Sequence, residues 1–120
     1  MTREEKDATR ERWRKLVRSG GPLPDSGLYA VFSGDRLLYV GMSFFMETRL
    51  TLHNNRDLFM EMNANRVVVR EIKDPDMCAV VERFLIWKLK PPLNKQVIQC
   101  GDISREYRWL RDWHCGQSWA

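Results

Sequence analysis

The sequence predicts a small α+β domain built on one three-stranded, mainly antiparallel sheet flanked by helices. Two β-forming runs at residues 28–32 and 37–41 are separated by a Ser-Gly-Asp turn, a pattern typical of a β-hairpin. A third run at 67–72 is rich in valine and predicts another strand. Charged segments at 3–18 and 75–90 have helical start and stop signals. The 120 residues, 43% of them hydrophobic, allow one such domain and exclude a disordered chain.

The predicted N-terminal helix over residues 3–18 has a start signal and a stop signal. Thr2 followed by Glu5 forms a capping box, and Gly20-Gly21 ends the helix. A short apolar stripe predicts that the helix docks on the core as an appendage. The stripe consists of Trp13, Leu16 and Val17.

The length of the hairpin loop decides whether Tyr29 and Tyr39 share a face of the sheet. A three-residue loop, Ser33 to Asp35, places the two tyrosines directly opposite each other, whereas a two-residue Gly34-Asp35 turn places them on opposite faces. We expect the three-residue loop. The alternative is that both are ordinary strand tyrosines packed in a half-buried sheet.

A second helix is predicted from Ser43, which serves as its N-cap, to about Arg56. Arg49 and His53 lie one turn apart in this segment, and Arg56 lies near the following turn. Side chains at this spacing share a helix face, so the pattern predicts a cationic strip. The alternative is a solvated helix face on which the histidine has no special role.

A third helix is predicted between Asp74-Pro75, a favourable start, and Pro91-Pro92, a stop. Beyond it the sequence predicts an extended piece at 96–100 and a last helix from Ser104. We expect residues 97–120 to be a C-terminal aromatic extension packing on the same domain, with stacking on nucleic-acid bases as the alternative. The arginines and aromatics behind this expectation are Arg105, Tyr107, Arg108, Trp109, Arg111 and Trp113.

Glu82 lies within the apolar stripe of the third predicted helix. Its sector of the helix contains Cys78, Ala79, Leu85, Ile86 and Leu89. A carboxylate among apolar neighbours needs a cation, a cluster of donors or a function, because burying an unpaired charge costs several kcal/mol. The alternative is a structural salt bridge to an arginine.

The excess positive charge lies near the N-terminus. Net charge is +4, and Lys6, Arg10, Arg14 and Arg18 recur every four residues, which predicts one basic ridge for a phosphate backbone. Neutralising four phosphates there predicts a slope of about −3.6 for log K against log salt. The alternative is a solvated face whose charges pair locally.

Composition limits the remaining classes of protein. No apolar run approaches the roughly 20 residues of a membrane helix, and the charged first twenty residues contain no secretory signal, so we expect a cytoplasmic protein without membrane contact. Three cysteines, Cys78, Cys100 and Cys115, do not form a disulfide framework, and Cys100 with His114 and Cys115 makes a poor zinc site.

Together these pieces resemble the GIY-YIG nucleases over about residues 26–95. The matching positions, in chain order, are Gly27-Leu28-Tyr29, Tyr39-Val40-Gly41, Ser43, Arg49 with His53, Glu82, and Asn94 after Pro91-Pro92-Leu93. Their shared order on strand, strand, helix and helix makes coincidence a poor explanation. The sequence departs from the family pattern at Met42 and Phe45. The resemblance implies a nuclease domain over 23–96, preceded by a basic helix and linker over 1–22.

The resemblance implies a metal-dependent DNA endonuclease that hydrolyses phosphodiester bonds, alone or as a homodimer. Glu82 would hold one Mg²⁺ or Mn²⁺, and Arg49 would bind the scissile phosphate. Tyr29 would act as general base or relay for the attacking water, with His53 and Tyr39 sharing or positioning its proton. The residues expected to contact DNA are Gly41, Ser43, Arg56, Asn94, Arg10 and Arg14.

Two other functions compete with this interpretation. The first is a nucleic-acid-binding module that has the GIY-YIG fold but does not cut. The second is a protein-interaction domain in which Glu82 and Arg49 form a structural ion pair. Cleavage that requires metal would distinguish a nuclease from the nucleic-acid-binding module. The stability of a Glu82→Gln variant would identify the protein-interaction domain, since breaking a buried ion pair costs about 3 to 5 kcal/mol.

Overall fold

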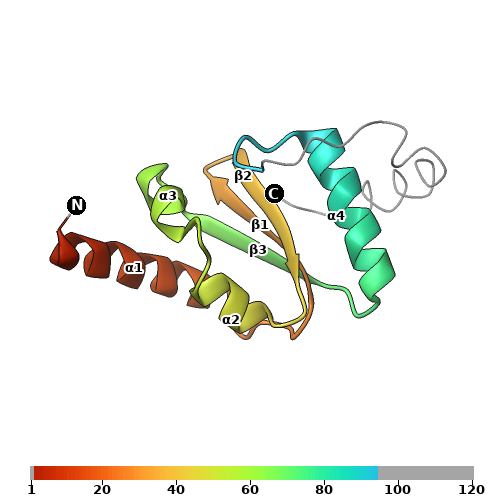
Figure 1. Cartoon of the computed structure of the whole chain (residues 1–120), viewed down its shortest axis with the longest axis horizontal. Helices are drawn as coiled ribbons and strands as arrows, with labels where there is room; N and C mark the ends of the chain where they lie inside the picture. Colours follow the sequence, from red (N-terminus) through yellow and green to blue (C-terminus); the bar gives the residue numbers. More distant parts are fainter. Residues whose placement is uncertain (1, 95–120) are drawn as a thin grey trace.

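The computed structural model describes residues 2–94 and confirms the α+β class and the three-stranded sheet, which is antiparallel throughout (Figure 1). The predictions for residues 96–100, for the helix from Ser104 and for the 97–120 extension lie outside the described residues. The elements in chain order are α1 (Arg3–Arg18), β1 (Gly27–Ser33), β2 (Arg36–Ser43), α2 (Met46–Thr51), α3 (Arg56–Glu61), β3 (Arg66–Glu71) and α4 (Pro75–Leu89).

Helices cover both faces of the sheet. The strand order is β2-β1-β3, and Figure 1 shows α4 on one side with α1, α2 and α3 on the other. Alternate residues of a strand point to opposite faces. Leu28 and Ala30 of β1 accordingly pack in the core cluster with α4, whereas Tyr29 and Val31 pack in the cluster that contains α1, α2 and α3.

The N-terminal helix α1 has the predicted bounds, and one of its faces belongs to the core. The Thr2 hydroxyl accepts a hydrogen bond from the Glu5 N–H at 3.1 Å, as expected for an N-cap. Trp13 is 0% exposed, and its indole Nε1–H donates to the Leu50 carbonyl at 2.7 Å. The helix therefore contributes a fully buried side chain to the second core cluster and is more than an appendage.

The hairpin turn is shorter than predicted. Ser33 pairs with Arg36, so the loop consists of Gly34 and Asp35 and the prediction of a three-residue loop was wrong. Gly34 adopts a φ of 60°, a conformation that glycine tolerates and that two-residue hairpin turns require. With a regular ladder, this turn would place the two strand tyrosines on opposite faces.

A β-bulge in β2 nevertheless places the two tyrosines on the same face of the sheet. Val31 pairs with Tyr39, but Phe32 pairs with Leu37, so Leu38 is an extra residue on β2. One extra residue changes the face to which all later residues of the strand point. Tyr29 and Tyr39 therefore share a face after all, in diagonal rather than directly opposite positions.

The second predicted helix is two short helices. A single helix from Ser43 to about Arg56 was wrong, because α2 ends at Thr51 and α3 begins at Arg56. Ser43 is the last residue of β2, and its hydroxyl accepts the N–H of Phe45, so Ser43 holds the strand-to-helix turn and does not cap α2. His53 accordingly lies in the connection between the helices.

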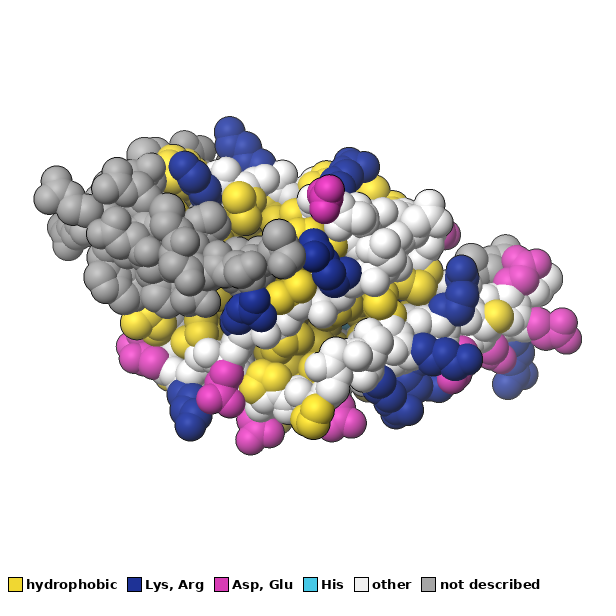
Figure 2. Space-filling view, turned by 180° about the vertical axis from the view of Figure 1, so that it is seen from behind, with side chains coloured by type: hydrophobic (Ala, Val, Ile, Leu, Met, Phe, Trp, Pro, Cys, Tyr) yellow, Lys and Arg dark blue, Asp and Glu magenta, His cyan; other side chains and the backbone are white. Residues whose placement is uncertain are grey.

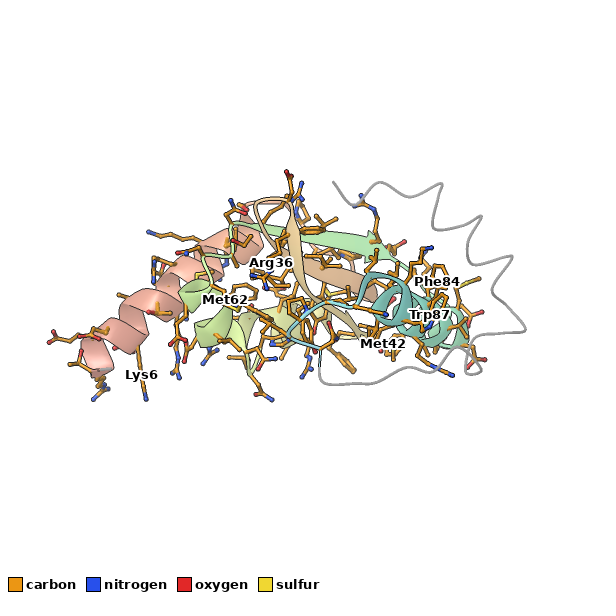
Figure 3. All side chains as sticks on the ribbon, turned by 90° about the horizontal axis from the view of Figure 1, so that it is seen from above. Lys6, Arg36, Met42, Met62, Phe84 and Trp87 are labelled. Carbon is orange, nitrogen blue, oxygen red and sulfur yellow. The ribbon has the colours of Figure 1, made fainter. Side chains whose placement is uncertain are left out.

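The remaining elements follow the predictions closely. β3 begins one residue earlier than expected, at Arg66. Asp74 caps α4 by accepting the N–H groups of Asp76 and Met77, and the helix ends at Leu89, before the two prolines. Figure 3 shows Phe84 and Trp87 of α4 at the same end of the molecule as Met42 of β2, and all three belong to the core cluster under α4. Within residues 2–94, no helix is both long and apolar enough to cross a bilayer.

Candidate functional site

A cleft of about 350 Å³ lies at the edge of the sheet beside β2. Four of the five residues predicted to be catalytic line it, together with the predicted asparagine. The lining residues are Tyr39, Val40, Arg49, His53, Asn54, Asn55, Glu82, Leu93 and Asn94. The structure thus brings together side chains that are 55 positions apart at the extremes, Tyr39 and Asn94.

The position of β2 at the edge of the sheet explains how these residues meet. Arg49 and His53 come from the helical layer on one face, and Glu82 comes from α4 on the other. Side chains from both layers can reach one cleft only beside a strand at the edge of the sheet, because elsewhere the sheet separates the two layers. The segment after α4 returns to this edge (Figure 1), where the Leu93 N–H donates to the Leu38 carbonyl at 3.0 Å.

The hydrogen bonds of His53 define its protonation state. The backbone N–H of Asn55 donates to Nδ1 at 3.0 Å, so Nδ1 carries no proton. Burial, with a smaller contribution from the Arg49 charge, lowers the pKa of His53 to about 4. The imidazole is therefore neutral at pH 7 with its proton on Nε2, which lies 2.9 Å from the Tyr29 hydroxyl and donates to it.

Tyr29 lies behind the cleft and Tyr39 faces it. Tyr29 is 0% exposed, whereas Tyr39 is partly buried and lines the cleft. The two rings stack with centroids 6.0 Å apart. Burial is the main cause that raises the pKa of Tyr29, and the Arg49 guanidinium partly offsets it. The same contact with Tyr29 raises the pKa of Arg49, so arginine and tyrosine are directly coupled.

Gly41 makes room for Tyr29. Gly41 pairs with Tyr29 across the two strands, and a Cβ at Gly41 would overlap the Cζ and the hydroxyl oxygen of Tyr29. Any larger residue would displace the phenol from His53. The structure thus places Gly41, which the sequence analysis assigned to DNA contact, against the tyrosine itself.

Glu82 lies in the cleft without an ion-pair partner among residues 2–94. Burial raises the pKa of its carboxyl, and the positive charge of Arg49 offsets part of this effect. Arg49 therefore acts on Glu82 through the cleft and not as a salt bridge within 4.0 Å. This geometry argues against a structural Glu82–Arg49 pair, and Glu82 remains a lining residue of the cleft.

The donors at the cleft suit one hydrated divalent cation of the magnesium type. Mg²⁺ keeps several water ligands and takes one or two carboxylates from a protein. Glu82 supplies one carboxylate in a cleft large enough for such waters. Among the described residues, no three or more His, Cys, Asp or Glu side chains are grouped so that they could hold a metal ion.

The residues predicted to contact DNA are dispersed. Asn94 satisfies both backbone groups of Val40, accepting its N–H at 2.9 Å and donating to its carbonyl at 2.8 Å, and so covers the exposed edge of β2. Arg56 donates to the Thr51 carbonyl at 3.0 Å. Of these predicted contacts, Asn94 alone lines the cleft.

The predicted basic ridge on α1 carries mixed charge. Arg14 forms a salt bridge with Glu11 at 2.7 Å, and Arg10 lies 3.7 Å from Asp57 of α3. Figure 2 shows acidic side chains among the Lys and Arg side chains along this helix, and in Figure 3 Lys6 points away from the rest of the fold. Local pairing thus occurs at two of the four ridge positions.

The sequence analysis missed Phe59, which supports the site from behind. Its ring centroid lies 5.0 Å from that of His53, 5.5 Å from that of Tyr39 and 5.2 Å from that of Trp13. Phe59 is fully buried on α3, in a segment for which the sequence analysis predicted no helix or strand. The available signal was the apolar run Leu58-Phe59-Met60.

Comparisons with protein-family models, with curated proteins and with solved structures found no match for this chain.

The state of His53 predicts how stability depends on pH. In the unfolded chain the imidazole binds a proton below about pH 6.5, whereas in the fold its pKa is about 4. The unfolded state therefore binds more protons between these values, and stability falls as pH falls through that window, by about 3 kcal/mol in total. Urea unfolding from pH 7.5 to 4 measures this loss. His53→Gln should flatten the dependence between pH 6.5 and 5, and an equally steep dependence in that variant would contradict the assignment.

Proposed function

We propose that this protein is a metal-dependent DNA endonuclease of the GIY-YIG type that hydrolyses phosphodiester bonds. The observation that carries the proposal is the single cleft in which Tyr39, Arg49, His53 and Glu82 converge, with the buried Tyr29 hydroxyl bound to His53 behind it. Phosphodiester hydrolysis needs an anchor for the phosphate, a path for the proton of the attacking water and stabilisation of the leaving oxygen.

Arg49 would bind the scissile phosphate. Its side chain is exposed to solvent at the cleft, and a planar guanidinium can bind two phosphate oxygens at once. Contact with Tyr29 raises its pKa, so the positive charge is secure at any working pH. Glu82 would hold one Mg²⁺ or Mn²⁺, which supplies positive charge to stabilise the leaving oxygen.

Tyr39, backed by Tyr29 and His53, would provide the path for the proton. Tyr39 lines the cleft, and its hydroxyl would take the proton of the attacking water while its own proton passes to solvent in the cleft. Tyr29 lies behind it, and its oxygen accepts the Nε2–H of His53. Burial raises the pKa of Tyr29, so the Tyr29 hydroxyl keeps its proton at neutral pH. Because the Nε2 atom of His53 already carries a proton, Tyr29 cannot pass its own proton to it, and the buried arrangement favours Tyr29 as a group that positions Tyr39 over Tyr29 as the direct base.

DNA is the proposed partner and the cytoplasm the proposed compartment. The protein would act alone or as a homodimer. A GIY-YIG fold that binds nucleic acid without cutting is the competing function, and cleavage that requires metal separates the two. The absence of an ion-pair partner for Glu82 among the described residues argues instead against a protein-interaction domain with a structural Glu82–Arg49 pair.

Arg49→Lys tests the proposal. Lysine keeps the charge but loses the bidentate geometry, so single-turnover cleavage of plasmid DNA with Mg²⁺ should slow by about 10²-fold. The matched control is Arg36→Lys, at an exposed position at the start of β2 and outside the cleft, which should cut at the wild-type rate. An Arg49→Lys variant that cuts as fast as this control would refute the assigned role of Arg49.

A further inference from the structure

A strip of exposed apolar side chains flanks α2, the helix that carries Arg49. Phe45 is 79% exposed, Leu52 is 62% exposed and Phe44 is 37% exposed. The Arg49 N–H donates to the Phe45 carbonyl at 2.9 Å, so one helical turn separates the two residues. Residues spaced by four and by seven share a helix face. Phe45, Arg49 and Leu52 have this spacing, with Phe45 at the N-cap of α2 and Leu52 at its C-cap.

The backbone holds Phe45 firmly. The Phe45 N–H donates to the Ser43 hydroxyl at 3.0 Å, and the next residue, the buried Met46, donates its N–H to the Asp25 carbonyl at 3.1 Å. While the Phe45 ring stays exposed to water, it buries little apolar surface and adds little to the stability of the fold. A partner that covered the ring would gain this apolar contact without first having to order the segment.

A hollow of about 410 Å³ adjoins Phe45, and its walls favour a base over a phosphate. Its lining combines apolar side chains with two acidic residues. The lining includes Leu23, Pro24, Asp25, Phe44, Phe45 and Glu47. Carboxylates repel phosphate oxygens but accept hydrogen bonds from the N–H groups of a nucleobase. Positive charge at Arg49 and negative charge in the hollow thus match the two ends of one nucleotide.

We propose that Phe45 stacks on an unpaired nucleobase beside the phosphate held by Arg49, and that the hollow receives this base. This inference rests on the proposed nuclease function and names its substrate class, a DNA with an unpaired nucleotide next to the cut. The hydrogen bond from Arg49 N–H to the Phe45 carbonyl places the two residues one helical turn apart, about 5.4 Å along the helix axis, which matches the reach from a nucleotide's phosphate to its base. A base paired within a duplex is stacked on both faces and cannot cover Phe45.

Binding of two DNAs without metal tests the inference. One is a fully paired 30-mer, and the other is the same duplex with a short unpaired bulge. Fluorescence anisotropy in chelator measures the Kd of each for the wild type, for Phe45→Ala and for Phe45→Trp. Stacking on one base makes the expected loss for Phe45→Ala on bulged DNA about 5- to 100-fold, with little change on paired DNA, and Phe45→Trp should restore binding. Leu89→Ala, which alters another exposed apolar residue on α4, is the control.

The outcomes separate this inference from the proposed function. Equal Kd changes on both DNAs, or no change in Phe45→Ala, would overturn the stacking role even if the protein cuts DNA. A change of oligomeric state in Phe45→Ala, measured by sedimentation, would overturn it too, because the strip would then contact a second copy of the chain. Selective loss on bulged DNA by a protein that never cuts would support the stacking role and refute the nuclease.

Discussion

Glu82→Gln is expected to abolish metal-dependent cleavage and to leave the fold as stable as the wild type or more stable. Glutamine removes the charge that would hold the cation, and losing that contribution of about 4 kcal/mol slows cleavage by about 10³-fold. Burial raises the pKa of Glu82, and none of the described residues lies within ion-pair distance of it. The ionised carboxylate therefore costs stability at neutral pH, and glutamine relieves that cost.

Thermal unfolding with and without metal completes this test. Mg²⁺ that binds only the folded state raises the stability of the wild type, and Glu82→Gln should lose this effect. Glu61→Gln, at an exposed position on α3 outside the cleft, should keep it. If Glu82→Gln instead loses about 3 to 5 kcal/mol in the absence of metal, Glu82 is a partner in a structural pair and not a metal ligand.

Trp13→Ala is expected to destabilise the protein by about 3 to 5 kcal/mol, as large-to-small changes at buried aromatic positions do. Trp13 is 0% exposed, its ring contacts Phe59, and its Nε1–H donates to the Leu50 carbonyl. That carbonyl also accepts the N–H of His53 at 3.3 Å. One acceptor thus links α1 to the turn that carries the histidine.

Trp13→Phe separates packing from positioning. Phenylalanine keeps most of the ring contact but loses the hydrogen bond, which costs about 1–2 kcal/mol of stability. Because the turn at His53 loses a constraint, kcat should fall further than the affinity for DNA. Urea unfolding and single-turnover cleavage measure the two effects, with Arg12→Ala at an exposed position on the same helix as the control. A loss below about 1 kcal/mol in Trp13→Ala would show that α1 is dispensable to the fold.

Local signals in the sequence predicted the elements that begin and end with strong caps. Thr2 and Asp74 cap α1 and α4 as expected, and helical periodicity placed Glu82 on the half-buried side of α4. These features depend on neighbours within a few residues, which the sequence displays directly. The α+β class followed from the same evidence.

The errors arose where contacts between distant segments decide the structure. The run Leu37-Leu38-Tyr39-Val40 is continuously apolar, so no alternation marks the bulge at Leu38. The short helix α3 has no side-chain cap, and its buried Phe59 packs against Trp13 of α1. The connection that holds His53 exists because α2 ends early. The sequence thus predicted which residues form the candidate site and their order along the chain. The partial exposure of Tyr39 and the burial of Tyr29 depend instead on the three-dimensional fold.

Cleavage itself is the most direct test of the proposed function. Wild-type protein and Glu82→Gln are incubated with plasmid, branched and single-stranded DNA, each with Mg²⁺, with Mn²⁺ and with chelator, and the products are separated on a gel. The proposal predicts that only the wild type with metal cuts. Binding of DNA by both proteins without cleavage by either would contradict it, and would identify the cleft as part of a nucleic-acid-binding module.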